Sequence, residues 1–223
     1  MEPLITQGSS KWPGVNMGHR ILLFCGILSS LLYMAMNVFI ARLYEGYNSI
    51  SQAVSELSAI GAPTKSLWVF PGVIYTLLVA AFGWGILKSA RHNKPLRISG
   101  GLLLAYGIVG LVWPFAPMHQ REVLAAGGAT LSDTFHIILS VITVLLMLLA
   151  MGFGAVAFGK PFRRYSLLTI GVLLVLGSWT AIDGAKLEAN LPTPWLGISE
   201  RILIGVFLLW IVVLAVILLR KTK

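Results

Sequence analysis

The stretch HQREVLAAGGATLSDTFH, residues 119–136, separates two long apolar runs and holds two of the four histidines of the chain. It also carries three charged residues, Arg121, Glu122 and Asp133. The runs on either side are long enough to cross about 30 Å of hydrocarbon as helices, because an α-helix rises about 1.5 Å per residue. The stretch is therefore predicted to be a polar connection between two membrane-spanning helices.

Composition excludes several classes of protein. The chain has 223 residues, of which 57% are hydrophobic and 11% charged, as is typical of a polytopic membrane protein rather than a soluble domain. The single cysteine, Cys25, lies in an apolar run and has no intrachain partner, which excludes a disulfide framework. The net charge of +9 comes from basic residues at the ends of apolar runs, so nucleic acid is not an expected partner.

Apolar runs of spanning length predict the architecture. There are six, at residues 21–41, 67–87, 98–117, 134–158, 165–182 and 198–219. We expect an all-α, polytopic membrane protein with an N-terminal segment at 1–20, a six-helix transmembrane domain at 21–219 and a basic tail at 220–223. Asn37 and Arg42, near the end of the first run, would be costly in lipid and are expected at the interface or against protein.

A short amphipathic helix is predicted in the first polar connection. Apolar residues recur there with helical spacing, at Ile50, Ala53, Val54 and Leu57. Ser49 is a plausible N-cap, and Gly61 followed by Pro63 would end the helix. Such a helix is too short to span and would lie along the surface with Glu56 on its polar face.

Charge predicts the orientation of the spans. Twelve of the 17 Lys and Arg residues fall on one side of the predicted membrane, so this side is expected to be cytoplasmic, with both termini inside. We expect a multi-pass protein of the cell inner (plasma) membrane. Seven of the eight acids fall on the opposite, outward side, at Glu45, Glu56, Glu122, Asp133, Asp183, Glu188 and Glu200.

The second, fourth and sixth spans begin on the outward side, and a Ser-acid pair precedes or opens each of them. These pairs are Ser55-Glu56, Ser132-Asp133 and Ser199-Glu200. Helix capping explains part of the pattern, with Thr130 or Ser132 capping the fourth span and Ser199 the sixth. Capping does not explain His136, which follows Asp133 by three residues on the same helix face. His119 is expected at the same opening of the bundle.

Three kinds of site fit these residues. Zinc could be bound by His119, Asp133 and His136, with Glu56 or Asp183 as a fourth ligand or base. Without a metal, Asp133 could orient His136 as a general base for water, Ser55 or Ser132. A non-catalytic site could instead hold an anionic headgroup. The candidate binding residues are Arg121, Glu122, Asp183, Glu200 and Arg201. The plainer alternative is that Asp133 and His136 satisfy each other beneath a loop.

Four segments carry a family resemblance: SELSAIGAPTKSLW at 55–68, PMHQRE at 117–122, LSDTFH at 131–136 and GISER at 197–201. Set on six spans, they resemble a bacterial family of integral membrane proteins known as domain of unknown function nine-nine-eight. The resemblance covers nearly the whole chain and implies no substrate or reaction. The chain is also distantly similar to seven-span hydrolases of the alkaline ceramidase type. That second likeness implies a membrane-embedded zinc, although those enzymes use three histidines where this chain has two outward ones.

The leading hypothesis is a membrane-embedded hydrolase of a lipid or lipid-linked substrate. Its catalytic residues would be Ser55, Glu56, Asp133 and His136, with His119 as a further zinc ligand. The rival hypothesis is a non-catalytic module that binds a lipid headgroup or small molecule, or a transporter. Transport ranks below binding because few polar residues lie in the middle of the predicted spans.

Overall fold

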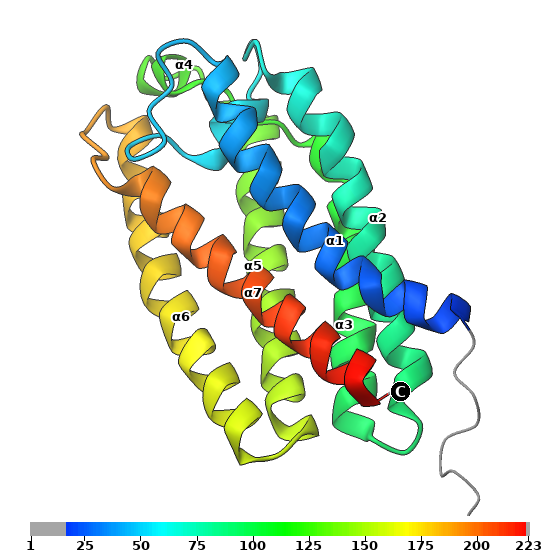
Figure 1. Ribbon diagram of the computed structural model, residues 1–223. Helices are drawn as coiled ribbons and strands as arrows, with labels where there is room; N and C mark the ends of the chain where they lie inside the picture. Colours follow the sequence, from blue (N-terminus) through cyan, green and yellow to red (C-terminus); the bar gives the residue numbers. More distant parts are fainter. Residues whose placement is uncertain (1–16, 222–223) are drawn as a thin grey trace, which may run out of the picture.

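The computed structural model describes residues 17–221, and six long helices run through them (Figure 1). They are α1 (Met17–Phe39), α2 (Lys65–Ala90), α3 (Lys94–Gly110), α5 (Leu131–Ala157), α6 (Lys160–Glu188) and α7 (Leu196–Lys221). Each is long and apolar enough to cross a membrane. Within the described residues the β-type pairing is confined to an isolated bridge between Ile60 and His119. The predicted all-α, six-span architecture is confirmed.

The helices form a closed ring. Helix α2 packs between α1 and α3, α5 packs between α3 and α6, and α7 closes the ring by contacting both α6 and α1 (Figure 1). Helices α2 and α3 approach closely at Gly107, where an added Cβ would lie 2.6 Å from the backbone nitrogen of Ala80. Small residues at such crossings allow the backbones of membrane helices to pack directly.

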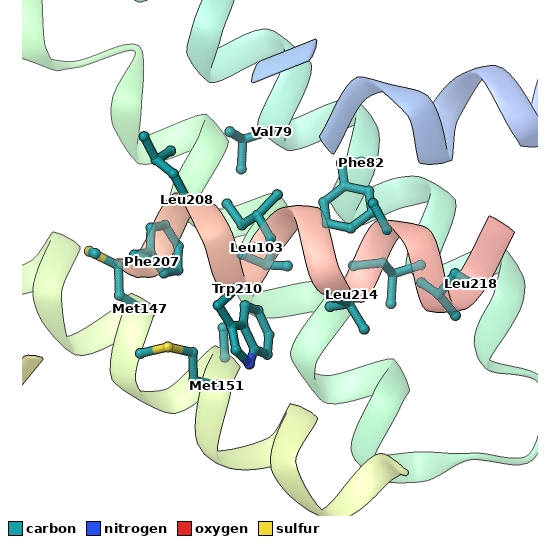
Figure 2. Packing of buried hydrophobic residues seen from close by; sticks show 14 of the residues in the cluster. Val79, Phe82, Leu103, Met147, Met151, Phe207, Leu208, Trp210, Leu214 and Leu218 are labelled. Carbon is teal, nitrogen blue, oxygen red and sulfur yellow. The ribbon is translucent and has the colours of Figure 1, made fainter. Parts of the chain in front are cut away.

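Apolar side chains fill the centre of the ring. Trp210 and Phe207 of α7 are 0% and 1% exposed, and they lie among Leu103, Met147 and Met151 of the neighbouring helices (Figure 2). The one polar atom of the Trp210 ring donates a 2.9 Å hydrogen bond to the Ser166 hydroxyl. An indole needs such a partner when it is buried in an apolar core. The interior is therefore packed, without a polar passage along its axis among these residues.

Helix α3 is shorter than its predicted span, whereas the other five long helices are longer, α6 by the most. Helix α3 ends at Gly110, and a 3-10 turn, η3 (Trp113–Phe115), follows it where the apolar run had predicted helix to residue 117. Pro114 and Pro117 lack the N–H that a continuing helix needs. Helix α6 extends beyond 165–182 at both ends, because charged residues continue a helix outside the hydrocarbon layer that hydropathy detects.

The prediction of an amphipathic helix after the first span is wrong. Residues 40–64, the α1–α2 connection, contain two short 3-10 turns, η1 (Ala41–Leu43) and η2 (Val54–Ser58), among other turns. Ala53 rather than Ser49 precedes η2, and its backbone N–H donates to the Glu56 carboxylate at 2.8 Å. Glu56 is 3% exposed, whereas an amphipathic surface helix would have left it in solvent. Hydrogen bonds from Arg121, Glu200 and Arg201 fix the conformation of this connection, which is why it does not form a helix.

The two ends of the bundle differ in charge. One end carries the α1–α2 connection, η3, the short helix α4 (Arg121–Ala125) and the connection from α6 to α7. All seven acids of the described residues lie at this end, which we call the acidic end. The segments that join α2 to α3 and α5 to α6 lie at the opposite, basic end. The predicted sorting of acids and bases into two groups thus follows the topology of the six helices.

Candidate functional site

The start of α7 binds the α1–α2 connection. Arg201 donates hydrogen bonds from Nη1 to the carbonyl oxygens of Ser49 (2.9 Å) and Gln52 (3.1 Å), and from Nη2 to the Tyr47 hydroxyl (2.7 Å). The Glu200 carboxylate accepts from the backbone N–H of Val54 at 2.7 Å. Both predicted binding residues of α7 are therefore engaged in holding a loop. Helix α7 begins at Leu196, so Ser199 lies inside the first turn and does not have the predicted capping position.

Tyr47 connects this contact to the rest of the loop. Its hydroxyl donates to the carbonyl oxygen of Ala53 at 2.7 Å while accepting from Arg201. Burial raises the pKa of Tyr47 to about 12, since the phenolate would be poorly solvated there. The phenol therefore stays protonated at neutral pH and keeps its role as a donor.

Glu56 and Arg121 form a buried ion pair between the α1–α2 connection and α4. Nε of Arg121 lies 2.8 Å from Oε2 of Glu56, and Nη2 lies 2.6 Å from Oε1. The carboxylate also accepts from the Ala53 N–H and from the Gln52 amide, so each oxygen has two donors. The hydrogen bonds that Arg121 donates to Glu56 raise the pKa of the guanidinium. Glu56, a predicted catalytic residue, is thus fully occupied by protein donors.

Asp133 lies in the first turn of α5 and joins it to the preceding loop. The carboxylate accepts from the backbone N–H of His119 (2.7 Å), from Nδ1 of the same histidine (2.8 Å) and from the backbone N–H of Thr130 (2.8 Å). Thr130 is the N-cap of α5, as predicted, and Asp133 completes the capping box. The Ser132 hydroxyl donates to the carbonyl oxygen of Pro117 at 2.6 Å.

His136 does not pair with Asp133, contrary to the prediction from their spacing. Its Nδ1 donates to the carbonyl oxygen of Ala116 at 2.8 Å, and its ring packs edge-on against Trp113 with centroids 5.0 Å apart. His119 takes the place beside Asp133 because the carboxylate faces its own helix cap and the loop that lies over it. The Ala116 carbonyl, in the loop directly after η3, gives His136 its partner.

The other predicted residues lie apart from this group. Asp183 is 3% exposed and bonds within α6, to Lys186 Nζ at 2.7 Å and to the Trp179 indole at 3.0 Å. Glu122 is exposed, and Ser55 is half-buried in η2. Neither side chain makes a hydrogen bond within the part of the chain that the structure describes.

The predicted zinc ligands do not form one ligand set. His119 faces Asp133, while His136 is turned to Ala116. Between residues 17 and 221 no group of three or more His, Cys, Asp and Glu side chains is arranged to hold a metal ion. The residues as arranged therefore do not fit a three-ligand zinc site. Zinc binding stays a prediction of the sequence.

A pocket of about 600 Å³ lies between the end of α1 and the start of α7. Its lining residues are Met34, Asn37, Val38, Ala41, Arg42, Tyr44, Glu45, Gly46, Tyr47, Ser49, Arg201 and Ile204. Of these, the sequence had indicated Arg201 as a binding residue, and Asn37 and Arg42 as polar groups that need a protein or interfacial environment. Glu45 was predicted as an outward acid without a role. Neither Tyr44 nor Tyr47 was predicted to bind a ligand, because the pocket forms where segments some 150 residues apart meet.

The model of a family described as "Protein of unknown function (DUF998)" matches residues 27–217. No curated protein matches the chain, and no solved structure does.

Proposed function

The chain belongs to the DUF998 family of proteins of unknown function, and we propose that it binds a lipid-like amphiphile of the membrane in the pocket between α1 and α7. The proposal rests on one observation: the charged residues of the pocket lining lie at one end of the pocket and the apolar residues at the other. On α1, Met34 and Val38 line it about one to two turns before Arg42, a distance of roughly 6 to 12 Å along the axis. On α7, Ile204 lies about one turn deeper than Arg201.

Such a gradient matches an amphiphile at the edge of a bilayer. The apolar part of the pocket lies toward the middle of the helices, at the depth of acyl chains. The charged part lies at their ends, at the depth of headgroups. The pocket volume of about 600 Å³ lies in the range of roughly 300 to 1,000 Å³ that is usual for small-molecule sites, enough for a headgroup and the adjoining part of its chains. The ligand would reach the site sideways from the lipid layer, because Met34 and Val38 are 47% and 42% exposed on the surface that faces lipid.

The proposed leaflet follows from the charge distribution. Ten of the 15 Lys and Arg residues between positions 17 and 221 lie at the basic end. The positive-inside rule therefore supports a cytoplasmic basic end and an outward acidic end. In this orientation the protein is an inner-membrane protein that samples lipids of the outward leaflet.

Filling the pocket tests the proposal. Val38→Trp places a large ring among the apolar lining residues and should reduce lipid retention at least tenfold, measured by native mass spectrometry of protein purified in mild detergent. Leu168→Trp is the matched control, because Leu168 is 72% exposed on α6, far from the pocket in sequence. Equal lipid retention by both variants and by the unsubstituted protein would contradict the proposal.

A second candidate function is hydrolysis, which the contact between Asp133 and His119 favours. Asp133 fixes Nδ1 of His119 at 2.8 Å, and the histidine side chain is 18% exposed. Nε2 has no partner among the described residues. A histidine held in this way can take a proton from water at Nε2 while the water oxygen attacks an ester carbonyl. His119 lines neither the pocket between α1 and α7 nor the shallower one at Phe162 and Val213, so binding is the better supported function.

His119→Gln tests the hydrolytic candidate together with metal analysis. Turnover of lipid esters, amides or phosphodiesters by the purified protein should fall at least a hundredfold in this variant. His92→Gln, at the basic end, is the control. No turnover by either protein on these substrates would end the hydrolase hypothesis. Zinc in stoichiometric amount that His119→Gln loses would instead favour the metal-dependent form.

Transport receives the least support. The ring of helices is filled by Trp210, Phe207 and their apolar neighbours (Figure 2). Alternating-access transporters place a polar site and broken helices near the middle of the membrane. Each of the six long helices described is instead continuous through that region.

A further inference from the structure

We infer that the pocket between α1 and α7 selects a zwitterionic headgroup with a phosphate and a primary ammonium, as in phosphatidylethanolamine. The phosphate would lie against Arg42, and the ammonium against Glu45 and Asn37. This inference rests on the proposed function, because it names the headgroup of the amphiphile that the pocket is proposed to hold. It is argued from three lining groups that lack a protein partner among the described residues, the side chains of Arg42 and Glu45 and the Oδ1 atom of Asn37.

Arg42 provides the cation for a phosphate. Its side chain is exposed, lines the pocket, and makes no hydrogen bond or ion pair in the described part of the chain. Arg201 lines the same pocket, but its Nη atoms already donate to Ser49, Gln52 and Tyr47. Arg42 is thus the guanidinium whose donors remain for a ligand. A guanidinium matches two phosphate oxygens in a forked geometry.

Glu45 provides an opposite charge close by. It follows Arg42 by three residues and lines the pocket, yet the two side chains do not form an ion pair. No other described residue binds its carboxylate. A purely anionic headgroup would meet Arg42 favourably and Glu45 unfavourably. A headgroup with both charges would satisfy the two residues together.

Asn37 requires a hydrogen-bond donor from the ligand. Its Nδ2 donates to the carbonyl oxygen of Tyr33 in its own helix at 3.2 Å, whereas Oδ1 is buried without a partner. Buried acceptors are rarely left unpaired. A primary ammonium has three N–H donors, enough for Glu45 and Asn37 together, whereas a choline headgroup has none.

The aromatic residues of the pocket also argue against choline. Quaternary ammonium groups are bound by cages of several aromatic rings. Tyr44 and Tyr47 stack on each other with centroids 5.6 Å apart. The Tyr47 ring is further covered by the Arg201 guanidinium, which lies 5.6 Å from its centroid. The remaining aromatic surface is too small for a cage.

Competition among lipids of equal chain length tests the headgroup. The protein would be placed in nanodiscs of equal parts phosphatidylethanolamine, phosphatidylglycerol and phosphatidylcholine, then extracted, and the bound lipid quantified. We expect at least a tenfold enrichment of phosphatidylethanolamine over each competitor. Glu45→Gln should abolish its advantage over phosphatidylglycerol, and Arg42→Gln should reduce binding of all three lipids. Glu188→Gln and Lys65→Gln, at the same end outside the pocket lining, are the matched controls.

The outcomes separate this inference from the proposed function. Binding of all three lipids alike, with no effect of Glu45→Gln, would overturn the headgroup and leave the amphiphile site standing. Preference for phosphatidylglycerol or phosphatidylcholine would also overturn it. No retained lipid of any kind would overturn the proposed function itself. Free phosphoethanolamine should compete only in more than hundredfold excess, and equal potency with the lipid would contradict an amphiphile site. The side chains of Arg42 and Glu45 make no hydrogen bond or ion pair with other described residues, so thermal unfolding of both variants should be unchanged.

Discussion

Glu56 and Arg121 show at the scale of single residues how a polar group near a membrane is made structural. The carboxylate has two donors on each oxygen, and two of the four come from one guanidinium. Arg121 also donates to the carbonyl oxygen of Ser51 at 3.1 Å. Removing one partner of such a buried pair leaves a charge without its counterion.

Glu56→Gln should therefore destabilise the protein by about 3 kcal/mol. For a chain of this size that corresponds to a decrease of roughly 10 °C in the unfolding temperature. Thermal unfolding in detergent, followed by tryptophan fluorescence, measures it. Glu122→Gln changes the neighbouring exposed acid and should shift the midpoint by less than about 2 °C. Equal shifts in the two variants would show that the ion pair does not hold the loop.

Tyr47 predicts a dependence on pH. Because burial raises its pKa to about 12, the folded protein holds the phenol proton more tightly than the unfolded chain, where the pKa is about 10. The stability that Tyr47 contributes is therefore full below pH 10 and is lost as the pH rises toward 12. Tyr47→Phe should lose less stability between pH 9 and pH 11 than the unsubstituted protein. An identical loss of stability in the variant and the unsubstituted protein would show that groups other than Tyr47 cause the pH dependence.

At the scale of elements, the first turn of α7 and the α1–α2 connection behave as one unit. A Cβ at Gly197 would overlap the carbonyl oxygens of Gln52 and Ser49, whereas Gly205, two turns later, has open space around it. Gly197→Ala should destabilise the protein by roughly 2 kcal/mol through overpacking. Gly205→Ala should be neutral or stabilise by up to about 1 kcal/mol, since alanine favours a helix. Chemical denaturation of the two variants measures the difference, and equal stability would refute the close fit.

Elements differ in how far the sequence predicts them. The six spans follow from runs of apolar residues, a signal that lies within each helix. The α1–α2 connection does not, because its shape depends on Arg121 and Arg201, which lie 65 residues or more along the chain. Ala53, Val54 and Leu57 have helical spacing and are buried, yet the side chain of Ile50, on the same predicted face, is 48% exposed. The hydrophobic periodicity thus predicted three buried residues correctly but not the backbone conformation that buries them.

In the candidate site, too, contacts between near neighbours in the sequence were predictable and contacts between distant segments were not. The pairing of Thr130 with Asp133 is local, and the capping pattern predicts it. The pairing of His119 with Asp133 joins residues 14 apart across a loop, so a helix-face argument favoured His136 in its place. The pocket joins Asn37 and Arg42 to Arg201. The sequence indicated Arg201 as a binding residue, but it indicated Asn37 and Arg42 only as polar groups that are costly near lipid.

At the scale of the whole molecule, the topology predicts which end faces the cytoplasm. In a Cys25→Ala background, a cysteine at Glu188 marks the acidic end and a cysteine at Lys160 marks the basic end. A membrane-impermeant maleimide should label the first in intact bacterial cells and the second only after permeabilisation. The reverse pattern would invert the orientation and move the proposed ligand to the inward leaflet.

The amphiphile site is the central claim, and photocrosslinking tests it most directly. The protein would be reconstituted with phosphatidylethanolamine that carries a photoreactive diazirine in one acyl chain, irradiated, and its adducts mapped by mass spectrometry. We predict that adducts concentrate on Met34, Val38 and Ile204, the apolar lining of the pocket. The concentration should disappear in Val38→Trp. Adducts spread evenly over the lipid-facing residues of α5 and α6, with no excess at the end of α1, would contradict the account.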